Sequence, residues 1–318
     1  MVHCTQKDLI FSKHSALSRL FIYYFCSLII AAILSPLCFN FVLFWDQYWP
    51  SKLTHYLVKK GFVIFFERIR MIALLLFLPS LIKLSHELQL FHKNSNEQKN
   101  FCPQMFFKYV LLGIALISLV VFMIFRSATS KYYFCLPEFS LINLFFLLKI
   151  IIGVSLLSFF EEWLFRGIIF KSIRQILPDI FAIIGASLLF AYFHFRPQYQ
   201  PPVYYNLFSG FQCLYEVIFH TLKFIAWDKF ALLFSFGALL SSAYNYTKSL
   251  LAPIGIHFGT VIALVFFQKN VYDLQNIRPI SLQSIINNPL TYVLLWGLTF
   301  YFYIKTIKKG TKNSTLLN

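Results

Sequence analysis

The sequence predicts an all-α fold, a polytopic bundle of about eight membrane-spanning helices. Hydrophobic residues make up 58% of the 318 residues and charged residues only 13%, whereas soluble domains are about 45–50% apolar and about 25% charged. Apolar stretches of about 20 residues recur along the chain, and each is long enough to cross a hydrocarbon core of roughly 30 Å. Stretches of this length are too long for buried strands.

Each expected span is bounded by basic, polar or proline-containing residues. The first span follows Lys7, Lys13 and Arg19 and is too long for the apolar region of a signal peptide, so we expect it to be retained. Residues 92–100 form the clearest polar loop, whereas residues 203–226 fit a re-entrant helix, an interfacial helix or a ninth span. The expected spans cover residues 20–45, 61–82, 106–125, 139–177, 179–195, 229–246, 248–268 and 289–306.

The net charge of +16 would indicate nucleic-acid binding in a soluble protein. Here Lys and Arg concentrate in tails and loops, as the positive-inside tendency and anionic headgroups produce. The expected partner is therefore the lipid bilayer and not a nucleic acid. The six cysteines form no C-x-x-C pair and several lie in apolar runs, which predicts buried hydrophobic side chains.

Two adjacent carboxylates and an arginine interrupt an apolar part of the chain, at Glu161, Glu162 and Arg166. A charge at the bilayer centre costs roughly 2.5–3.5 kcal/mol, so such residues indicate either mutual pairing or a functional site. Arg166 lies four residues after Glu162, a helical spacing that predicts an ion pair. Glu161 points about 100° away, which predicts a reactive carboxylate that acts as a general base. The same three charges fit equally well a purely structural role in holding helices together.

His194, at the end of the sequence Phe-Ala-Tyr-Phe-His, is the next candidate. Pro178 lies between it and the carboxylates, and proline disfavours helix in the preceding residue, so one helix should end near Leu177 and another begin. Glu162 lies sixteen residues before Pro178 and His194 sixteen after it. Along antiparallel helices both would lie about 24 Å from the bend. This matched depth favours a catalytic role for His194 over a packing role.

The third candidate is His257, which lies among Pro253, Gly255 and Gly259. These residues predict an irregular helix that allows close approach of its neighbours and frees backbone groups to face protein or water. Thr260 lies three residues further on and shares the face of His257. A packing histidine at a kinked helix is the alternative interpretation.

One carboxylate and two histidines in a water-accessible pocket of the bilayer are suited to hydrolysis. Glu161, assisted by His194, would deprotonate a water molecule, and His257 would donate a hydrogen bond to the oxyanion that forms. The same three residues could instead bind zinc. No H-E-x-x-H motif is present and the spacings match no short metal signature, so we expect no cofactor.

The pattern E-E-x-x-x-R, then F-x-x-x-H, then a histidine shortly after Leu-Ala-Pro-Ile-Gly resembles the CPBP family. This family contains the type II CAAX prenyl endopeptidases and the abortive-infection-like proteins. The resemblance implies an eight-helix intramembrane endopeptidase of the glutamate type, with Glu161 and His194 as the catalytic pair and His257 at the oxyanion. It covers residues 139–268, and we divide the chain into a three-span region (1–138), this core (139–268), and a last span with a cytoplasmic tail (269–318).

Val261 departs from the family pattern, because members usually carry Asn or Asp four residues after the third histidine. An apolar side chain cannot donate to an oxyanion, so the oxyanion site is either incomplete or served by Thr260. A catalytically weak relative that acts as a binding or immunity protein is therefore the second hypothesis. A transporter is the third, although the paired broken helices that would support it are missing.

The expected substrate is a membrane-anchored or C-terminally processed protein. The expected location is a cell membrane, with the bacterial inner membrane favoured by the composition.

Overall fold

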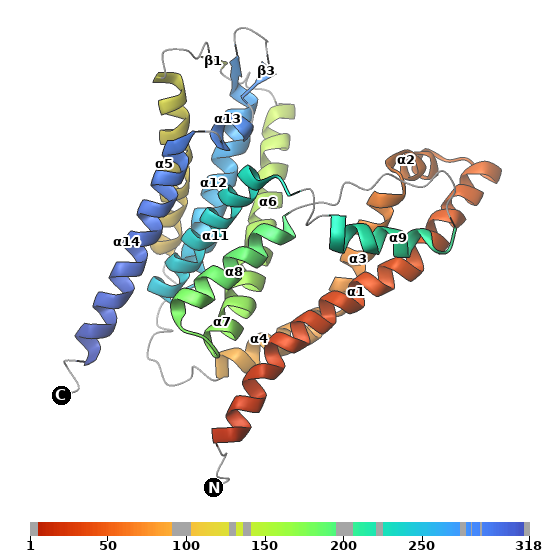
Figure 1. Cartoon of the computed structure of the whole chain (residues 1–318). Helices are drawn as coiled ribbons and strands as arrows, with labels where there is room; N and C mark the ends of the chain where they lie inside the picture. The colour runs from red at the N-terminus through yellow and green to blue at the C-terminus, as the bar shows by residue number, and fades with distance from the viewer. Residues whose placement is uncertain are drawn as a thin grey trace. The chain divides into compact units, whose positions relative to one another are not determined.

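The computed structural model is almost entirely helical, which confirms the all-α fold class (Figure 1). Among the described residues, four helices are long and apolar enough to cross a membrane: Ala16–Tyr48, Pro103–Arg126, Leu251–Asn270 and Pro289–Lys309. The count of eight spans stays a prediction. The structure describes residues 6–90, 103–126, 132–135, 141–194, 206–220, 225–273, 278–280, 282–286 and 288–314.

The chain forms two compact units. The first contains Met1–Phe91 and Phe193–Ala226, and the second contains His92–Tyr192 and Trp227–Asn318. The predicted division at residues 138 and 268 follows the family resemblance and stays a prediction.

The first unit is organised around one long helix, α1 (Gln6–Tyr48), which packs against α3 and α9. Buried side chains of α1 such as Leu28 and Phe39 meet Phe62 and Phe66 of α3. Gly210 of α9 lies so close to the backbone of Ala32 that no side chain would fit there. The remaining elements are α2 (Lys52–Lys60), α3 (Phe62–Leu76), α4 (Leu78–Leu90), α9 (Ser209–Tyr215) and the π-helix η3 (Glu216–His220).

Two sequence predictions fall on this unit. Within the described part of the ambiguous segment, residues 209–220 form a helix of about 18 Å at 1.5 Å per residue, too short to cross a bilayer. Residues 203–205 and 221–224 lie outside the described residues, as does the expected loop 92–100.

The sequence also predicted that the cysteines are buried. This holds for Cys213, but it is wrong for Cys38 and for Cys135 of the second unit, whose side chains are exposed.

The second unit is a helical bundle in which α12 packs against both α5 and α6, and α11 packs against α14 (Figure 1). The unit also contains a three-stranded antiparallel sheet with the order β1-β2-β3, which the sequence did not predict. Strand β1 follows α5 in the chain, and it pairs with β2, which directly follows α12. Its register pairs Tyr133 with Tyr272 and Tyr272 with Pro279. The elements are α5 (Pro103–Arg126), β1 (Tyr132–Phe134), α6 (Leu141–Glu162), η2 (Trp163–Phe170), α7 (Lys171–Arg174), α8 (Asp179–Phe193), α11 (Trp227–Thr247), α12 (Leu251–Asn270), β2 (Val271–Asp273), β3 (Arg278–Pro279), α13 (Leu282–Ile286) and α14 (Pro289–Ser314).

Helices α5 and α12 approach each other along a seam of glycines. A Cβ atom added at Gly255 would lie 2.9 Å from the carbonyl oxygen of Phe106, and one at Gly113 would lie 2.8 Å from the backbone nitrogen of Thr260. Gly259 likewise lies against the backbone of Val110. This seam confirms the predicted close approach and fixes the position of α12, the helix that carries His257.

Replacing Gly259 with Ala is expected to destabilise the protein by about 1–3 kcal/mol, because the added methyl group meets backbone that cannot move aside. Gly297→Ala is the matched control, since nothing lies within 4 Å of its Cβ position on α14. The control should be neutral or stabilising by up to about 1 kcal/mol through the lower entropy of the unfolded chain. Thermal unfolding of both variants in the same detergent measures the difference, and equal stability would contradict the proposed tight seam.

Candidate active site

The two carboxylates lie where the helical backbone changes its geometry. Glu161 and Glu162 are the last residues of α6, and the chain continues directly into the π-helix η2, which contains Arg166. π-helical turns are rare in proteins, and those that do occur often lie at functional sites. From Phe165 to Phe170, every side chain of η2 is buried, so the distorted turn lies inside the bundle.

Glu162 and Arg166 form an ion pair with no exposure to solvent, with Nη1 of Arg166 2.9 Å from the Glu162 carboxylate. The predicted pairing at i and i+4 is thereby confirmed. Arg166 also donates through Nη2 to the carbonyl oxygen of Gly237, at 3.1 Å, and its guanidinium lies 4.7 Å from the ring centroid of Phe190. Arg166 therefore connects η2 to both α8 and α11.

Glu162 has a second partner, His257 of α12. The distance between Nδ1 of the histidine and Oε1 of the glutamate is 2.8 Å, and because a carboxylate only accepts, the ring nitrogen donates this bond. The rings of Phe190 and Phe236 meet the imidazole edge-to-face, at centroid distances of 6.2 and 5.5 Å. The histidine side chain is 5% exposed, so its orientation is set by the carboxylate and by the two aromatic rings.

Glu161 lies at the other nitrogen of the same imidazole. Its Oε2 is 3.8 Å from Nε2 of His257, and its side chain is 22% exposed, whereas that of Glu162 is fully buried. The two adjacent carboxylates thus have different surroundings. Glu162 is bonded on two sides, and Glu161 is the more accessible of the pair.

The helical hairpin expected around Pro178 is present. α7 ends at Arg174 and α8 begins at Asp179, and the rings of Phe165 and Phe190 pack across the hairpin with centroids 5.1 Å apart. Phe165 lies thirteen residues before Pro178 and Phe190 twelve after it, so residues at similar distances from the bend do lie level.

Asp179 holds the turn of this hairpin in place. Its carboxylate accepts a hydrogen bond of 2.7 Å from Nε of Arg174 and another of 2.8 Å from the side-chain amide of Asn245 on α11. Lys248 in turn donates to Asn245 at 2.8 Å. This polar network connects the turn between α7 and α8 to the end of α11.

His194 follows α8 directly, in the turn after Phe193, and its side chain is exposed. It belongs to the first compact unit, whereas Glu161, Glu162 and His257 belong to the second. The convergence of His194 on Glu161 therefore stays a prediction.

The prediction of an irregular backbone around His257 is wrong. α12 is a regular α-helix from Leu251 to Asn270, and Pro253 lies in its first turn, where the missing amide hydrogen has no helical acceptor to lose. The backbone irregularity lies at η2 instead. Thr260 is buried, and its hydroxyl has no hydrogen-bond partner among the described residues, while Val261 is half-buried.

Sequence reasoning missed the contributions of Gly237 and Phe236 on α11. A Cβ atom at Gly237 would lie 3.1 Å from Cα of Ser187, so this glycine lets α11 approach α8 closely and present its carbonyl to Arg166. A run of small residues on α11, which includes Ala238, Ser241 and Ser242, could have predicted this close approach. Small residues are enriched where helices pack closely in membranes.

A zinc site was the alternative use of Glu161, His194 and His257. Among the described residues, no three His, Cys, Asp or Glu side chains are grouped so that they could hold a metal ion. Because His194 belongs to the other compact unit, this finding does not test the three residues together, and the absence of a metal cofactor stays a prediction.

Comparison with known proteins identifies one family. Residues 141–263 match the family model described as type II CAAX prenyl endopeptidase Rce1-like, which confirms the resemblance inferred from the sequence motifs. All six candidate site residues lie within the matched segment. No curated protein and no solved structure matches the chain.

Proposed function

Because residues 141–263 belong to the Rce1-like family of type II CAAX prenyl endopeptidases, we propose that the protein is an intramembrane endopeptidase that uses a water molecule activated by Glu161 and His194. The family indicates a CAAX protease-like peptidase, and the long apolar helices indicate a membrane protein. The observation that carries the proposal is the His257 imidazole, which lies between the buried carboxylate of Glu162, paired with Arg166, and the carboxylate of Glu161, whose side chain is partly exposed.

In the proposed reaction, Glu161 removes a proton from water while His194 helps to orient the same molecule. The water oxygen attacks the carbonyl carbon of the substrate, and the electron pair of the carbonyl bond moves to its oxygen. When the tetrahedral intermediate collapses, the C–N bond breaks and the leaving amine takes the proton back from Glu161. Support comes from the greater exposure of Glu161 compared with Glu162.

His257 is proposed to stabilise the oxyanion. Nδ1 donates to Glu162, and a proton on Nε2 would be donated towards the side of Glu161. A donor already held in place by Glu162 needs no reorganisation when negative charge develops on the substrate oxygen. Glu162 and Arg166 do not contact the substrate in this proposal, and they position the imidazole.

The proposed substrate is a membrane-anchored or C-terminally processed protein, because the site lies in the part of the chain that matches a family of CAAX prenyl endopeptidases. We place the enzyme in a cell membrane, and the bacterial inner membrane fits the composition of the chain.

His194→Ala is expected to abolish cleavage while leaving the protein level unchanged, because the water would lose one of its two orienting groups. Comparative membrane proteomics measures this: a protein terminus that is trimmed in cells with the wild-type enzyme should be longer in cells with the variant. His86→Ala is the matched control, since His86 is an exposed histidine of α4, and it should preserve trimming. If His194→Ala trims the same terminus at the wild-type rate, His194 has no catalytic role.

A binding or immunity protein that retains the buried ion pair only for packing is the second candidate. Val261 supports it, because an apolar residue stands where family members usually carry a polar one. Under this alternative, Glu162→Ala unfolds the protein while Glu161→Ala has no phenotype in cells. Loss of trimming in Glu161→Ala would exclude the alternative.

A further inference from the structure

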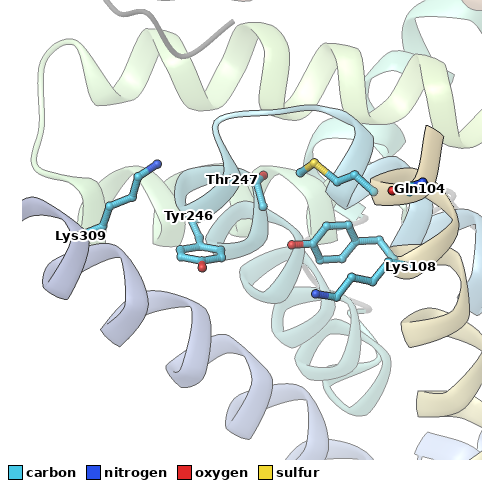
Figure 2. A pocket seen from close by; sticks show the side chains of 7 residues that line it. Gln104, Lys108, Tyr246, Thr247 and Lys309 are labelled. Atoms are coloured by element: carbon cyan, nitrogen blue, oxygen red, sulfur yellow. The ribbon is translucent and has the colours of Figure 1, made fainter. Parts of the chain in front are cut away.

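A cavity lined by both polar and apolar side chains lies in the second compact unit, and neither Glu161 nor Glu162 lines it. It has a volume of about 460 Å³ and opens between the beginning of α5, the end of α11 and the last turns of α14 (Figure 2). This volume is typical of small-molecule pockets. Its lining residues are Gln104, Met105, Lys108, Tyr109, Tyr246, Thr247 and Lys309.

The lining offers hydrogen-bond donors and positive charge. Lys108 enters from α5 and Lys309 from α14, with Tyr246 and Thr247 of α11 between them (Figure 2). The two lysines are exposed, whereas Tyr109 is only 7% exposed and forms part of the cavity wall. Such a combination of ammonium, phenol and amide groups is suited to an anion.

The helices that build the cavity contain few acidic side chains. α5 and α14 contain no Asp or Glu, and α11 contains only Asp228. Asp228 lies in the first turn of α11, eighteen residues before Tyr246, which places it about 27 Å away along the helix. Further lysines of α14, at positions 305 and 308, add to the positive field at this end.

The helix ends favour an anion as well. Gln104 and Met105 belong to the first turn of α5, a helix of 24 residues whose dipole places a partial positive charge at this end. The end of α11 would have the opposite effect, but the carbonyl oxygens of Ala243 and Tyr244 already accept bonds from the Thr247 hydroxyl and the Lys248 amide. The beginning of α5 thus adds a partial positive charge to that of the two lysines.

We propose that this cavity binds the phosphate of an anionic phospholipid headgroup. We assign the phosphate to a lipid because of where the cavity lies along the helices. It is found where one candidate membrane span, Pro103–Arg126, begins and another, Pro289–Lys309, ends. Headgroups occupy that level of a bilayer, and basic pockets between the ends of spanning helices bind them. The thioether of Met105 and the rings of Tyr109 and Tyr246 provide apolar contact for the glycerol region.

Native mass spectrometry of the full chain in a neutral detergent, titrated with phosphatidylglycerol and with phosphatidylcholine, tests the proposal. We expect the wild-type protein to bind phosphatidylglycerol about tenfold more tightly than phosphatidylcholine. The double change Lys108→Gln with Lys309→Gln should remove this preference. Lys305→Gln with Lys308→Gln removes the same charge outside the cavity lining and should lower the affinity much less than the cavity variant does, because these lysines contribute only to the general field.

Other results of these titrations would overturn the proposed lipid site. Equal losses in the two double variants would show attraction to general surface charge and overturn the proposal. Competition by inorganic phosphate at the same concentration as lipid would identify a free phosphate site and overturn the lipid assignment. Met105→Trp fills the cavity without changing its charge, so it should also abolish the preference, and it provides an independent test if the lysine variant does not fold.

Discussion

Glu161→Gln is expected to lower the rate of peptide hydrolysis by about 10²–10⁴-fold, the range that general base catalysis contributes. The amide has the size of the carboxylate and preserves an oxygen near Nε2 of His257, 3.8 Å from the native Oε2. It cannot accept the proton of the attacking water. The measurement is the rate of product formation by purified protein in liposomes, with the trimmed membrane protein found by proteomics as substrate.

Glu87→Gln is the control for the same chemical change. Glu87 lies on α4 and pairs with Arg19 at 3.0 Å, and both side chains are about one-third exposed to solvent (32% and 37%). Surface pairs of this kind contribute little to stability, so this variant should retain the wild-type rate. Hydrolysis by Glu161→Gln at the rate of the Glu87→Gln control would remove the proposed mechanism.

The parts of the fold and site that the sequence predicted correctly rest on local rules. A spacing of four residues places Arg166 beside Glu162, and Pro178 ends one helix and starts the next. The apolar runs of α1, α5, α12 and α14 are long enough to identify them as candidate spans without any tertiary information. In each case the cause lies within one helix or one turn.

The parts that could not be predicted depend on contacts between distant segments. The hydrogen bond between His257 and Glu162 joins residues 95 positions apart, and no periodicity in the sequence indicates it. The sequence assigned the distorted backbone to Pro253, but proline in a first turn fits a regular helix. The π-helix η2 has no proline and one glycine, and its geometry accompanies the burial of Arg166 against α8 and α11.

The bond between His257 and Glu162 also changes how the two carboxylates are interpreted. The sequence separated a structural Glu162 from a reactive Glu161. In the structure both approach one imidazole, Glu162 at Nδ1 and Glu161 at Nε2. The structural pair therefore orients a side chain proposed to act in the reaction, so changes at Glu162 or Arg166 should affect both stability and hydrolysis.

Arg166→Met is expected to destabilise the protein by about 3–5 kcal/mol, because it leaves the carboxylate of Glu162 buried without its cationic partner. The double change Glu162→Gln with Arg166→Met replaces both charges by neutral groups of similar size. Its amide oxygen can still accept from Nδ1 of His257, so the double variant should be more stable than Arg166→Met by more than about 1 kcal/mol. Unfolding of the detergent-solubilised variants by heat or denaturant measures the difference.

Arg126→Met is the control for the same side-chain change, since Arg126 is exposed at the last residue of α5. It should alter stability by no more than about 0.5 kcal/mol. If Arg166→Met were as stable as this control, the Glu162 carboxylate would have to be satisfied by other groups, and the imidazole of His257 would not depend on the ion pair. If the single and double variants were equally unstable, the loss would come from packing of Arg166 against Phe190 and not from an uncompensated charge.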